Sequence, residues 1–255
     1  MSFDVAASAY DSFMGRFSRP LAAALLDRLD VAPGQGAVDV GCGPGALTSL
    51  LAERLGAEAV AAIDPSEPFV DALRERLPGV DVRRGGAETL PWADGSFDLA
   101  AANLVVSFMS EPGTGLSEMA RVARGGVVAA TVWDFDENVG PLGVFWAAAR
   151  DLDSAAPNET HLPGTRSGHL AELVRAAGMQ VVDASPLEIA VAFDSLTGWW
   201  EPFTHGVGPA GGYVGALDEQ QRTALRARVG ERLGVTDPDV PFTMRARSSC
   251  VIAQA

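Results

Sequence analysis

Short apolar runs alternate with segments of helical periodicity along most of this 255-residue chain. Short apolar runs indicate buried strands, whereas apolar positions three or four apart indicate amphipathic helices. The pattern predicts strands at residues 37–40, 58–64, 80–83, 97–105, 126–133, 178–192 and 242–253, and helices at 47–55, 68–77 and 116–124. Strands that alternate with helices predict an α/β fold with a doubly wound, parallel sheet, which binds its ligand beyond the carboxyl ends of the strands.

The turn after the first strand is the most informative segment, VDVGCGPGALT at residues 38–48. Gly41, Gly43 and Gly45 can adopt positive φ and have no Cβ, so a ligand can approach the main chain, and the following helix offers unpaired N–H groups. We interpret this turn as a cofactor cradle. Gly41, Gly43 and Ala46 also fit the dinucleotide fingerprint G-x-G-x-x-A, so the turn alone leaves the cofactor open.

Composition narrows the function classes. Hydrophobic residues make up 47% of the chain and charged residues 20%, as expected for a globular protein with one sizeable core. We expect a cytoplasmic protein, because no N-terminal leader pattern or membrane-spanning apolar run is present. Two cysteines, Cys42 and Cys250, are too few for a disulfide framework or a zinc site, so no metal is predicted.

The charged residues argue against a nucleic-acid substrate and against lysine-dependent chemistry. A net charge of −14 repels phosphate backbones, so nucleic acid is not expected as a substrate. The sequence contains no lysine, which excludes Schiff-base chemistry, a P-loop and a Tyr-x-x-x-Lys reductase site.

Each strand of the first half is followed by residues suited to bind part of a nucleoside-containing cofactor. Asp64 ends the second strand before Pro65, where a carboxylate can accept both hydroxyl groups of a ribose. A helix cap is the competing interpretation of this aspartate. Further candidate cofactor contacts follow the third and fourth strands: Ala87, Glu88, Asn103, Leu104 and Val105.

Two motifs resemble those of one enzyme family. VDVGCGPG resembles motif I of the class I S-adenosylmethionine (SAM)-dependent methyltransferases, and GGAETLPWADGSFDLAAANLVVSFMSEP is similar to the adenine-binding and fourth-strand region of the UbiE-like, or methyltransferase type 11, family. The resemblance extends over nearly the whole chain. It implies SAM as the cofactor, contacts from Asp39, Gly41, Cys42 and Gly43, and a Rossmann-like seven-stranded sheet with an antiparallel last strand.

The resemblance also implies two covering segments around a single methyltransferase domain. Residues 1–30 would form an N-terminal lid in which Tyr10, Met14 and Arg16 contact the cofactor, with Arg16 on its carboxylate. The core would comprise 36–194 and 240–255, and a helical lid inserted at 195–239 would cover the substrate. Candidate substrate contacts on this insertion are Trp199, Trp200, Phe203 and Tyr213. A satellite core or a dimer contact is the other interpretation of these aromatic residues.

Two departures from the family pattern stand out. The family usually carries an acid before the alanine of its DAE motif, whereas this chain has Gly86, so adenine recognition would rest on Glu88 or another group. The R-P-G-G turn before the fifth strand is shortened to Arg124, Gly125 and Gly126, for which we expect no functional consequence.

No motif in the sequence identifies a catalytic residue. Methyl transfer from a sulfonium needs mainly alignment in a dry site, and a general base helps only if the acceptor is a hydroxyl. His205, among the aromatic residues of the insertion, and Asp134, after the fifth strand, are the candidates.

Three hypotheses follow from the sequence. The first is a SAM-dependent methyltransferase that acts on a small apolar or aromatic molecule, as a monomer or a homodimer. The second is an NAD(P)-dependent oxidoreductase, disfavoured by the absence of lysine and by Asp39. The third is a SAM-binding module without catalysis.

Overall fold

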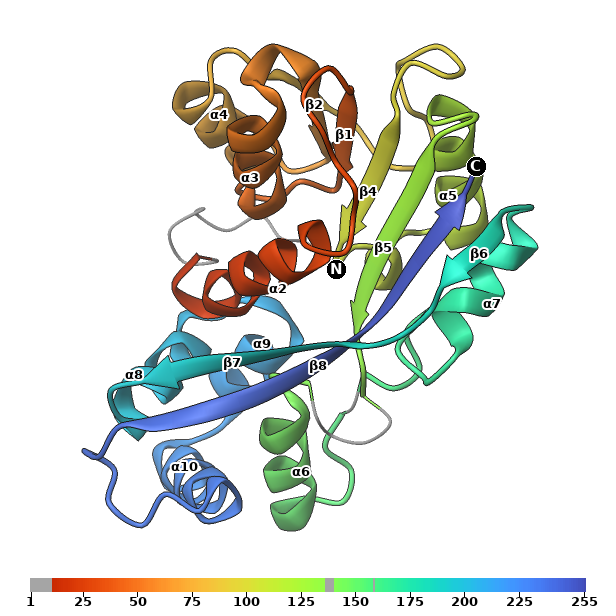
Figure 1. Cartoon of the computed structure of the whole chain (residues 1–255). Helices are drawn as coiled ribbons and strands as arrows, with labels where there is room; N and C mark the ends of the chain where they lie inside the picture. The colour runs from red at the N-terminus through yellow and green to blue at the C-terminus, as the bar shows by residue number, and fades with distance from the viewer. Residues whose placement is uncertain (1–10, 136–139, 158) are drawn as a thin grey trace.

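A computed structural model describes residues 11–135, 140–157 and 159–255. Within these residues eight strands form one sheet, in the order β3-β2-β1-β4-β5-β8-β6, with β7 also paired to β8 (Figure 1). The strands are β1 (Ala37–Val40), β2 (Val60–Asp64), β3 (Asp81–Arg84), β4 (Leu99–Asn103), β5 (Val127–Trp133), β6 (Gln180–Asp183), β7 (Leu187–Phe193) and β8 (Phe242–Gln254). Strands β1 to β5 are parallel, and β8 is antiparallel to β5, β6 and β7. The prediction of a doubly wound, mostly parallel sheet with an antiparallel last strand is confirmed.

The sixth strand differs from its prediction, because it is divided into β6 and β7. The interruption at residues 184–186 contains Pro186, which has no N–H to continue a ladder. Arg28 holds the interruption in place, since its guanidinium donates to the carbonyl oxygens of Ser185 at 2.8 Å and Pro186 at 2.7 Å. The long β8 therefore pairs with β6 at one end and with β7 at the other.

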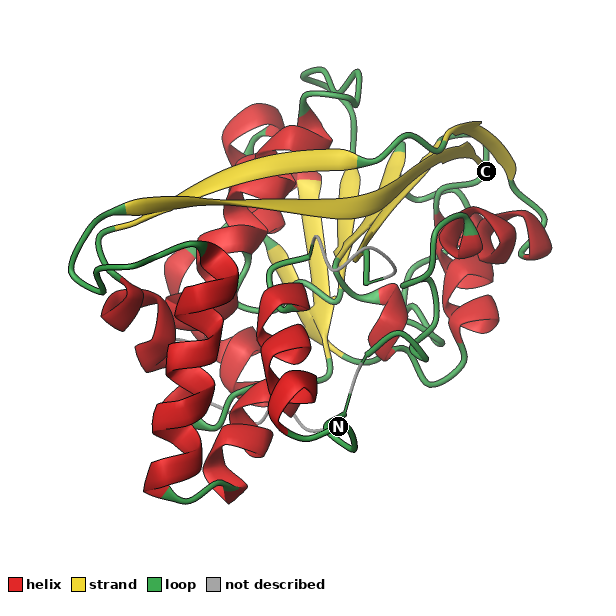
Figure 2. Ribbon diagram, turned by 90° about the horizontal axis from the view of Figure 1, so that it is seen from below, coloured by secondary structure: helices red, strands yellow, loops and turns green. Residues whose placement is uncertain are grey.

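Helices cover both faces of the sheet (Figure 2). They are α2 (Arg16–Leu26), α3 (Ala46–Leu55), α4 (Glu67–Arg76), α5 (Pro112–Val122), α6 (Gly143–Leu152), α7 (His169–Ala176), α8 (Leu196–Trp200), α9 (Gly208–Ala216) and α10 (Glu219–Leu233). Alternate residues of each strand face opposite sides, so one sheet yields two apolar layers. Ala37 and Leu99 pack in the layer of α2 and α3, whereas Val38 and Ala100 pack in the layer of α5 and α7.

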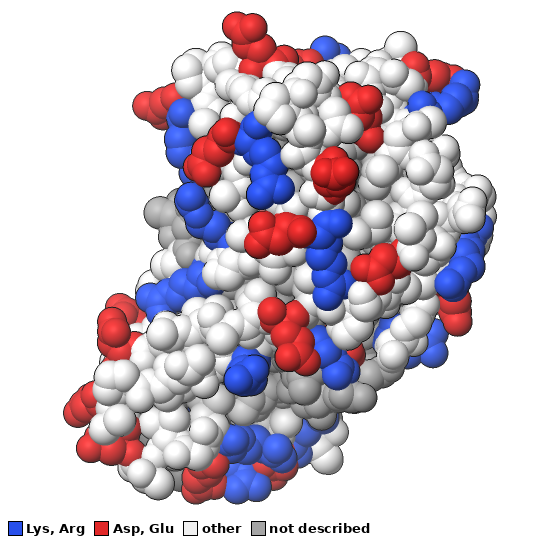
Figure 3. Space-filling view, in the orientation of Figure 1, with Lys and Arg blue, Asp and Glu red and all other residues white. Residues whose placement is uncertain are grey.

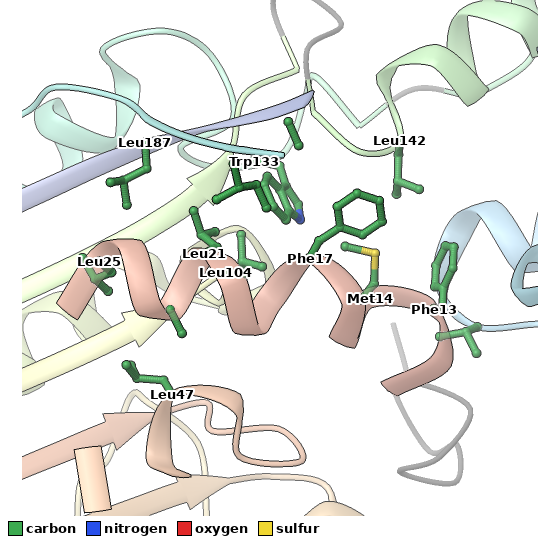
Figure 4. Packing of buried hydrophobic residues seen from close by; sticks show 14 of the residues in the cluster. Phe13, Met14, Phe17, Leu21, Leu25, Leu47, Leu104, Trp133, Leu142 and Leu187 are labelled. Atoms are coloured by element: carbon green, nitrogen blue, oxygen red, sulfur yellow. The ribbon is translucent and has the colours of Figure 1, made fainter. Parts of the chain in front are cut away.

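Helix α2 lies between the parallel strands and the β7–β8 arm. Its buried residues recur at helical spacing along RFSRPLAAALL, so one face is apolar over the whole helix. Figure 4 shows Phe17 and Leu21 on the side of α2 that faces Trp133 and Leu187 of β7, with Leu47 of α3 on the opposite side of the helix. This helix therefore joins the two halves of the sheet.

The helices between β7 and β8 form a layer of their own. The β7–β8 arm extends beyond the parallel strands, and α8, α9 and α10 lie along it together with α6 (Figure 1). Among the described residues no helix has the length and apolar character to cross a membrane. Acidic and arginine side chains are interspersed on the face shown in Figure 3. Ion pairs between the two kinds of side chain include those of Asp151 with Arg228 and Arg232.

Candidate functional site

The glycines of the turn between β1 and α3 have the positive φ values that the sequence predicts. Gly41, Gly43 and Gly45 have φ values of 72°, 52° and 90°. The amides of Gly41 and Cys42 both donate to the carbonyl oxygen of Ile63 on β2, at 2.8 and 3.0 Å. These bonds hold the turn open at the carboxyl edge of the sheet.

Gly41 is a position where only glycine fits. A Cβ at Gly41 would overlap the side chain of Val105, and its positive φ disfavours any other residue. We expect Gly41→Ala to lower the free energy of unfolding by about 2 kcal/mol, because left-handed backbone and overpacking each cost about 1–2 kcal/mol. Gly34→Ala is the control: its φ is 97°, but nothing lies within 4 Å of the added Cβ. Equal losses in urea unfolding of the two variants would contradict a packing role for Gly41.

A buried aspartate lies directly below this turn. Asp39, in β1, is 1% exposed, and its Oδ2 accepts a hydrogen bond from the Thr48 hydroxyl at 2.6 Å. Its other oxygen, Oδ1, has no hydrogen-bond partner in the described part of the chain. Burial raises the pKa of the Asp39 carboxyl to about 7, opposed by the Thr48 hydrogen bonds and reinforced by the nearby charge of Asp64. An unpartnered carboxylate oxygen of this kind is suited to a cation.

The pKa of Asp39 predicts a pH-dependent affinity for a cationic ligand. In the free protein the carboxyl is protonated below about pH 7, and it must lose its proton to bind a cation. We therefore expect the affinity for a ligand that carries an ammonium group to fall about tenfold for each pH unit below 7. Titration calorimetry with S-adenosylhomocysteine (SAH) between pH 6 and 8 measures this slope. Asp39→Asn should flatten it, and an equally steep slope in that variant would assign the proton to another group.

A second aspartate ties the glycine turn to β2. Asp64 ends β2, and its two oxygens accept from the amides of Gly43 and Ser66, both at 2.8 Å. Burial raises the pKa of its carboxyl, and these two amide bonds oppose the shift. Each carboxylate oxygen has further acceptor capacity, so Asp64 can receive hydroxyl groups of a ligand as well.

The end of the third strand is joined to the segment after β4. Glu88 Oε1 accepts from the amides of Ser110 at 2.9 Å and Glu111 at 3.3 Å, just before α5. Its Oε2 lies 2.9 Å from the position that a Cβ on Gly86 would occupy. The glycine that departs from the family pattern therefore makes room for the carboxylate of Glu88.

The end of β4 is fixed by hydrogen bonds to β5 and α2. Leu104 has a φ of 68°, and its amide donates to the carbonyl oxygen of Thr131 at 3.0 Å. Asn103 accepts from the Thr131 hydroxyl at 2.8 Å and donates from Nδ2 to the carbonyl oxygen of Ser18 at 3.3 Å. Asn103 thereby connects helix α2 to the carboxyl edge of the sheet.

These strand ends surround one cavity of about 640 Å³. A volume between roughly 300 and 1,000 Å³ is typical of small-molecule sites. Eleven of the residues that the sequence suggests as cofactor contacts line it: Asp39, Gly41, Cys42, Gly43, Asp64, Pro65, Ala87, Glu88, Asn103, Leu104 and Val105. Burial raises the pKa of the Cys42 thiol well above its usual value, so this thiol is neutral.

The charged side chains of the lining are mostly acidic. Asp39, Asp64, Glu67 and Glu88 face one arginine, Arg84, among the described lining residues. The guanidinium of Arg84 is paired with Glu67 at 2.8 Å. The cavity is therefore suited to a cationic ligand and unsuited to a diphosphate.

Ser18, Phe108 and Met109 are among the lining residues that the sequence analysis did not suggest as contacts. Ser18 is the buried polar residue on the apolar face of α2, and its spacing from Met14 and Leu21 is the signal that could have placed it there. Phe108 and Met109 follow the fourth strand and line the cavity beyond Val105. Phe108 is 41% exposed. An exposed apolar residue after a strand suggests a ligand contact only once the fold shows that it lines a cavity.

Of the three N-terminal contacts that the sequence suggests, the two that the structure describes lie outside the cavity lining. Tyr10 falls outside the described residues. Met14 is buried in the core, and Arg16 does not line the cavity. The guanidinium of Arg16 donates to the carbonyl oxygen of Gly198 at 3.1 Å and lies 5.5 Å from the ring centre of Phe193. Arg16 thus contacts the end of β7 and the start of the insertion, and not the cavity.

The aromatic residues of the insertion pack against one another. The ring centres of Trp199 and Trp200 lie 4.6 and 5.9 Å from that of Phe203. Phe203 also stacks on Phe145 of α6 at 4.7 Å, and Tyr213 meets the same ring at 6.3 Å. None of these four insertion residues lines the large cavity, so in this structure they form a satellite core.

The two candidate bases also lie outside the cavity lining. His205 is exposed at the end of a short helical turn, Glu201–His205. Asp134 is buried, and its Oδ2 pairs with the guanidinium of Arg247 on β8 at 2.8 Å. That ion pair gives Asp134 a role in joining β5 to β8. Among the described residues no group of His, Cys, Asp and Glu side chains is arranged to hold a metal ion.

Comparison with known proteins agrees with this geometry. Residues 38–130 match the family model described as "Methyltransferase domain". The nocamycin O-methyltransferase of Saccharothrix syringae is 32% identical over 228 residues, which cover 78% of this chain and 79% of that protein. An uncharacterized 37.1 kDa protein encoded in transposon TN4556 of Streptomyces fradiae is 33% identical over 217 residues, 80% of this chain but 61% of its own length.

A solved structure shares the fold at low sequence identity. Geranyl diphosphate methyltransferase in complex with SAM superposes with a TM-score of 0.54 and 15% identity, over 94% of this chain and 86% of that one.

Proposed function

Because this chain belongs to the class I SAM-dependent methyltransferases, we propose that it transfers the methyl group of SAM to an oxygen of a small apolar or aromatic metabolite, by in-line displacement. The O-methyltransferase in the name of the Saccharothrix relative supports oxygen as the nucleophile. The acidic cavity supports a small-molecule acceptor over a nucleic acid, because phosphates would be repelled there.

The acidic glycine cradle is the observation that carries this proposal. SAM carries a sulfonium and an ammonium group, whereas a nicotinamide dinucleotide carries two phosphates. The unpartnered Oδ1 of Asp39 fits an ammonium group. The absence of a Cβ at Gly41 leaves room for the side chain of Val105, another residue of the cavity lining. Four carboxylates beside one paired arginine favour the cation over the dinucleotide.

We assign the parts of the cofactor to residues around the cavity. Asp39 would hold the ammonium group, and Asp64 would accept the ribose hydroxyls. Glu88 and the backbone of Ala87 would hold the adenine end, since both line the cavity at the end of the third strand. These assignments rest on the chemistry of each side chain and on its place along the cavity.

The protein's own task in the reaction is alignment and exclusion of water. Bound SAM supplies a methyl group already activated by the sulfonium. Asn103 and Leu104 fix the wall of the cavity through Thr131, and the Asn103–Ser18 bond keeps α2 over it. Such fixed positioning lowers the barrier by removing the entropy cost of alignment.

We further propose that the N-terminal segment and the insertion 195–239 cover the acceptor together. Arg16 bonds to Gly198, and the rings of Phe13 and Phe203 meet at 4.8 Å in an edge-to-face contact. These contacts support a joint movement of α2 and the insertion when a ligand enters.

Labelled-methyl transfer tests the proposal. The protein is incubated with methyl-labelled SAM and a panel of phenols, alcohols and carboxylic acids, and labelled products are identified by mass spectrometry. The expected result is a labelled ether or ester from a small apolar member of the panel, abolished in Asp64→Ala. Tight SAM binding without any labelled product would favour the non-catalytic hypothesis.

A further inference from the structure

Two buried polar side chains at the carboxyl edge of the sheet have no hydrogen-bond partner among the residues that the structure describes. Trp133 is the last residue of β5 and is 7% exposed, and Ser248 of β8 is fully buried. The indole Nε1 of Trp133 and the hydroxyl of Ser248 are both unpartnered. The two residues are direct register partners in the antiparallel β5–β8 pair, so their side chains project on the same face of the sheet.

The unpartnered indole of Trp133 differs from those of Trp92 and Trp146, which are both hydrogen-bonded. The indole N–H of Trp92 donates to Asp81 at 3.0 Å, and that of Trp146 donates to Glu159 at 2.8 Å. Leaving a buried donor unsatisfied is costly, so such a group calls for an explanation. A ligand that supplies the missing acceptor atom is one explanation with testable consequences.

The position of Trp133 fits a ligand that lies beside the part of the cavity lined by Leu104. In open α/β sheets the ligand binds beyond the carboxyl ends of the strands. Leu104, which lines the large cavity, bonds through its amide to Thr131, two residues before Trp133. Trp133 therefore ends the strand next to β4, whose end supplies Leu104 to the cavity wall.

The surroundings of Trp133 are apolar and partly aromatic. The ring of Phe17 meets the indole edge-on at 6.3 Å, and Phe17 also lies 5.8 Å from Phe193. Figure 4 shows the indole of Trp133 facing Phe17, with Leu104 and Leu142 on either side. A cavity of only about 10 Å³ remains beside Phe17, Leu142 and Phe193, so the layer is closed in this structure.

We propose that Trp133 and Ser248 bind the methyl acceptor: the indole N–H and the serine hydroxyl donate to an oxygen of a neutral aromatic molecule. Its ring occupies the layer between Phe17 and Leu142, which opens when α2 and the insertion separate. The assignment rests on the proposed methyltransferase function, and it specifies the acceptor as a molecule with an aromatic body and a hydrogen-bond-accepting oxygen. It also adds two specificity residues that belong to neither covering segment.

The test compares Trp133→Phe and Ser248→Ala with a matched control, Trp146→Phe. SAH-loaded proteins are titrated with 2-naphthol and with naphthalene, which lacks the oxygen, and their melting temperatures are measured by calorimetry. Wild type should bind 2-naphthol more tightly than naphthalene. Trp133→Phe and Ser248→Ala should each weaken 2-naphthol binding by about three- to tenfold, the worth of one hydrogen bond, with SAH affinity unchanged.

Stability separates a ligand contact from a structural one. Trp133→Phe and Trp146→Phe leave cavities of similar size, but only the second breaks an existing hydrogen bond. We therefore expect Trp146→Phe to melt roughly 3–8 °C below Trp133→Phe while it keeps the 2-naphthol affinity of wild type. Ser248→Ala should melt at or above the wild-type temperature, because it removes an unsatisfied hydroxyl.

Three results would overturn the assignment. The first is wild-type 2-naphthol affinity in both site variants, and the second is a wild type that does not prefer 2-naphthol to naphthalene. The third is an equal loss of stability in Trp133→Phe and Trp146→Phe, which would show that the Trp133 N–H serves the fold. Failure of wild type to bind SAH would instead refute the proposed function itself, which makes the two failures distinguishable.

Discussion

Asp64→Ala should weaken SAH binding by about 100-fold. The substitution removes the acceptor for the Gly43 amide at 2.8 Å, which orders the glycine turn, and the assigned acceptor for the ribose hydroxyls. Hydrogen bonds to a charged group are worth about 1.5–3 kcal/mol, and 100-fold corresponds to about 2.7 kcal/mol. Titration calorimetry at pH 7.5 measures the affinity.

The control for this loss is Asp71→Ala. Asp71 is an exposed acid on α4 with a surface ion pair to Arg74, so its removal changes the net charge equally without touching the cavity. We expect the affinity of that variant to stay within about twofold of wild type. A folded Asp64→Ala protein with wild-type SAH affinity would show that the ribose is held elsewhere.

Phe203→Ala should lower the free energy of unfolding by about 3–5 kcal/mol. Phe203 is buried and packs against Phe13, Phe145, Trp199 and Trp200, so its truncation opens a cavity where α6, the insertion and the N-terminal segment meet. Urea unfolding measures the loss.

Phe203→Leu is the matched variant, because it retains most of the apolar volume. It should recover more than half of the stability lost in Phe203→Ala. A loss below about 1 kcal/mol in Phe203→Ala, accompanied by weaker acceptor binding, would instead make Phe203 a ligand contact. That outcome would restore the sequence-based hypothesis that the insertion aromatics contact the substrate directly.

The first half of the fold could be predicted because its signals are local. The strand at 37–40, the three glycines and Asp64 at the end of a strand are each visible within about ten residues. Parallel strand ends meet at one edge of the sheet, so these local signals also predict that the candidate cofactor residues lie close together. The cavity lined by Asp39, Asp64 and Glu88 is where the sequence predicted it.

The remaining parts depend on contacts between distant segments. Asp134 is 113 residues from its partner Arg247, and Arg16 is 182 residues from Gly198. No local pattern indicates such pairs, so both residues were suggested for the site although their partners lie elsewhere. Pro186 did mark the division of the sixth strand, but the apolar residues on both sides of it obscured the signal.

The insertion illustrates a second limit. Its aromatic residues and glycines are compatible with a substrate lid and with a packed core, because composition does not specify which face of a helix meets the protein. The structure pairs Phe203 with Phe145, and that contact between segments far apart in the sequence decides how the rings pack here. The Trp133–Ser248 pair escaped the sequence for the same reason, since only the β5–β8 register brings them together.

The central claim is that the acidic glycine cradle binds a sulfonium cofactor, and titration calorimetry with SAM, SAH and NADH tests it most directly. We predict micromolar or tighter binding of SAM and SAH, with proton release below pH 7 as Asp39 ionises, and no measurable heat with NADH. Binding of NADH alone would contradict this claim and would identify the glycine turn as a dinucleotide-binding motif.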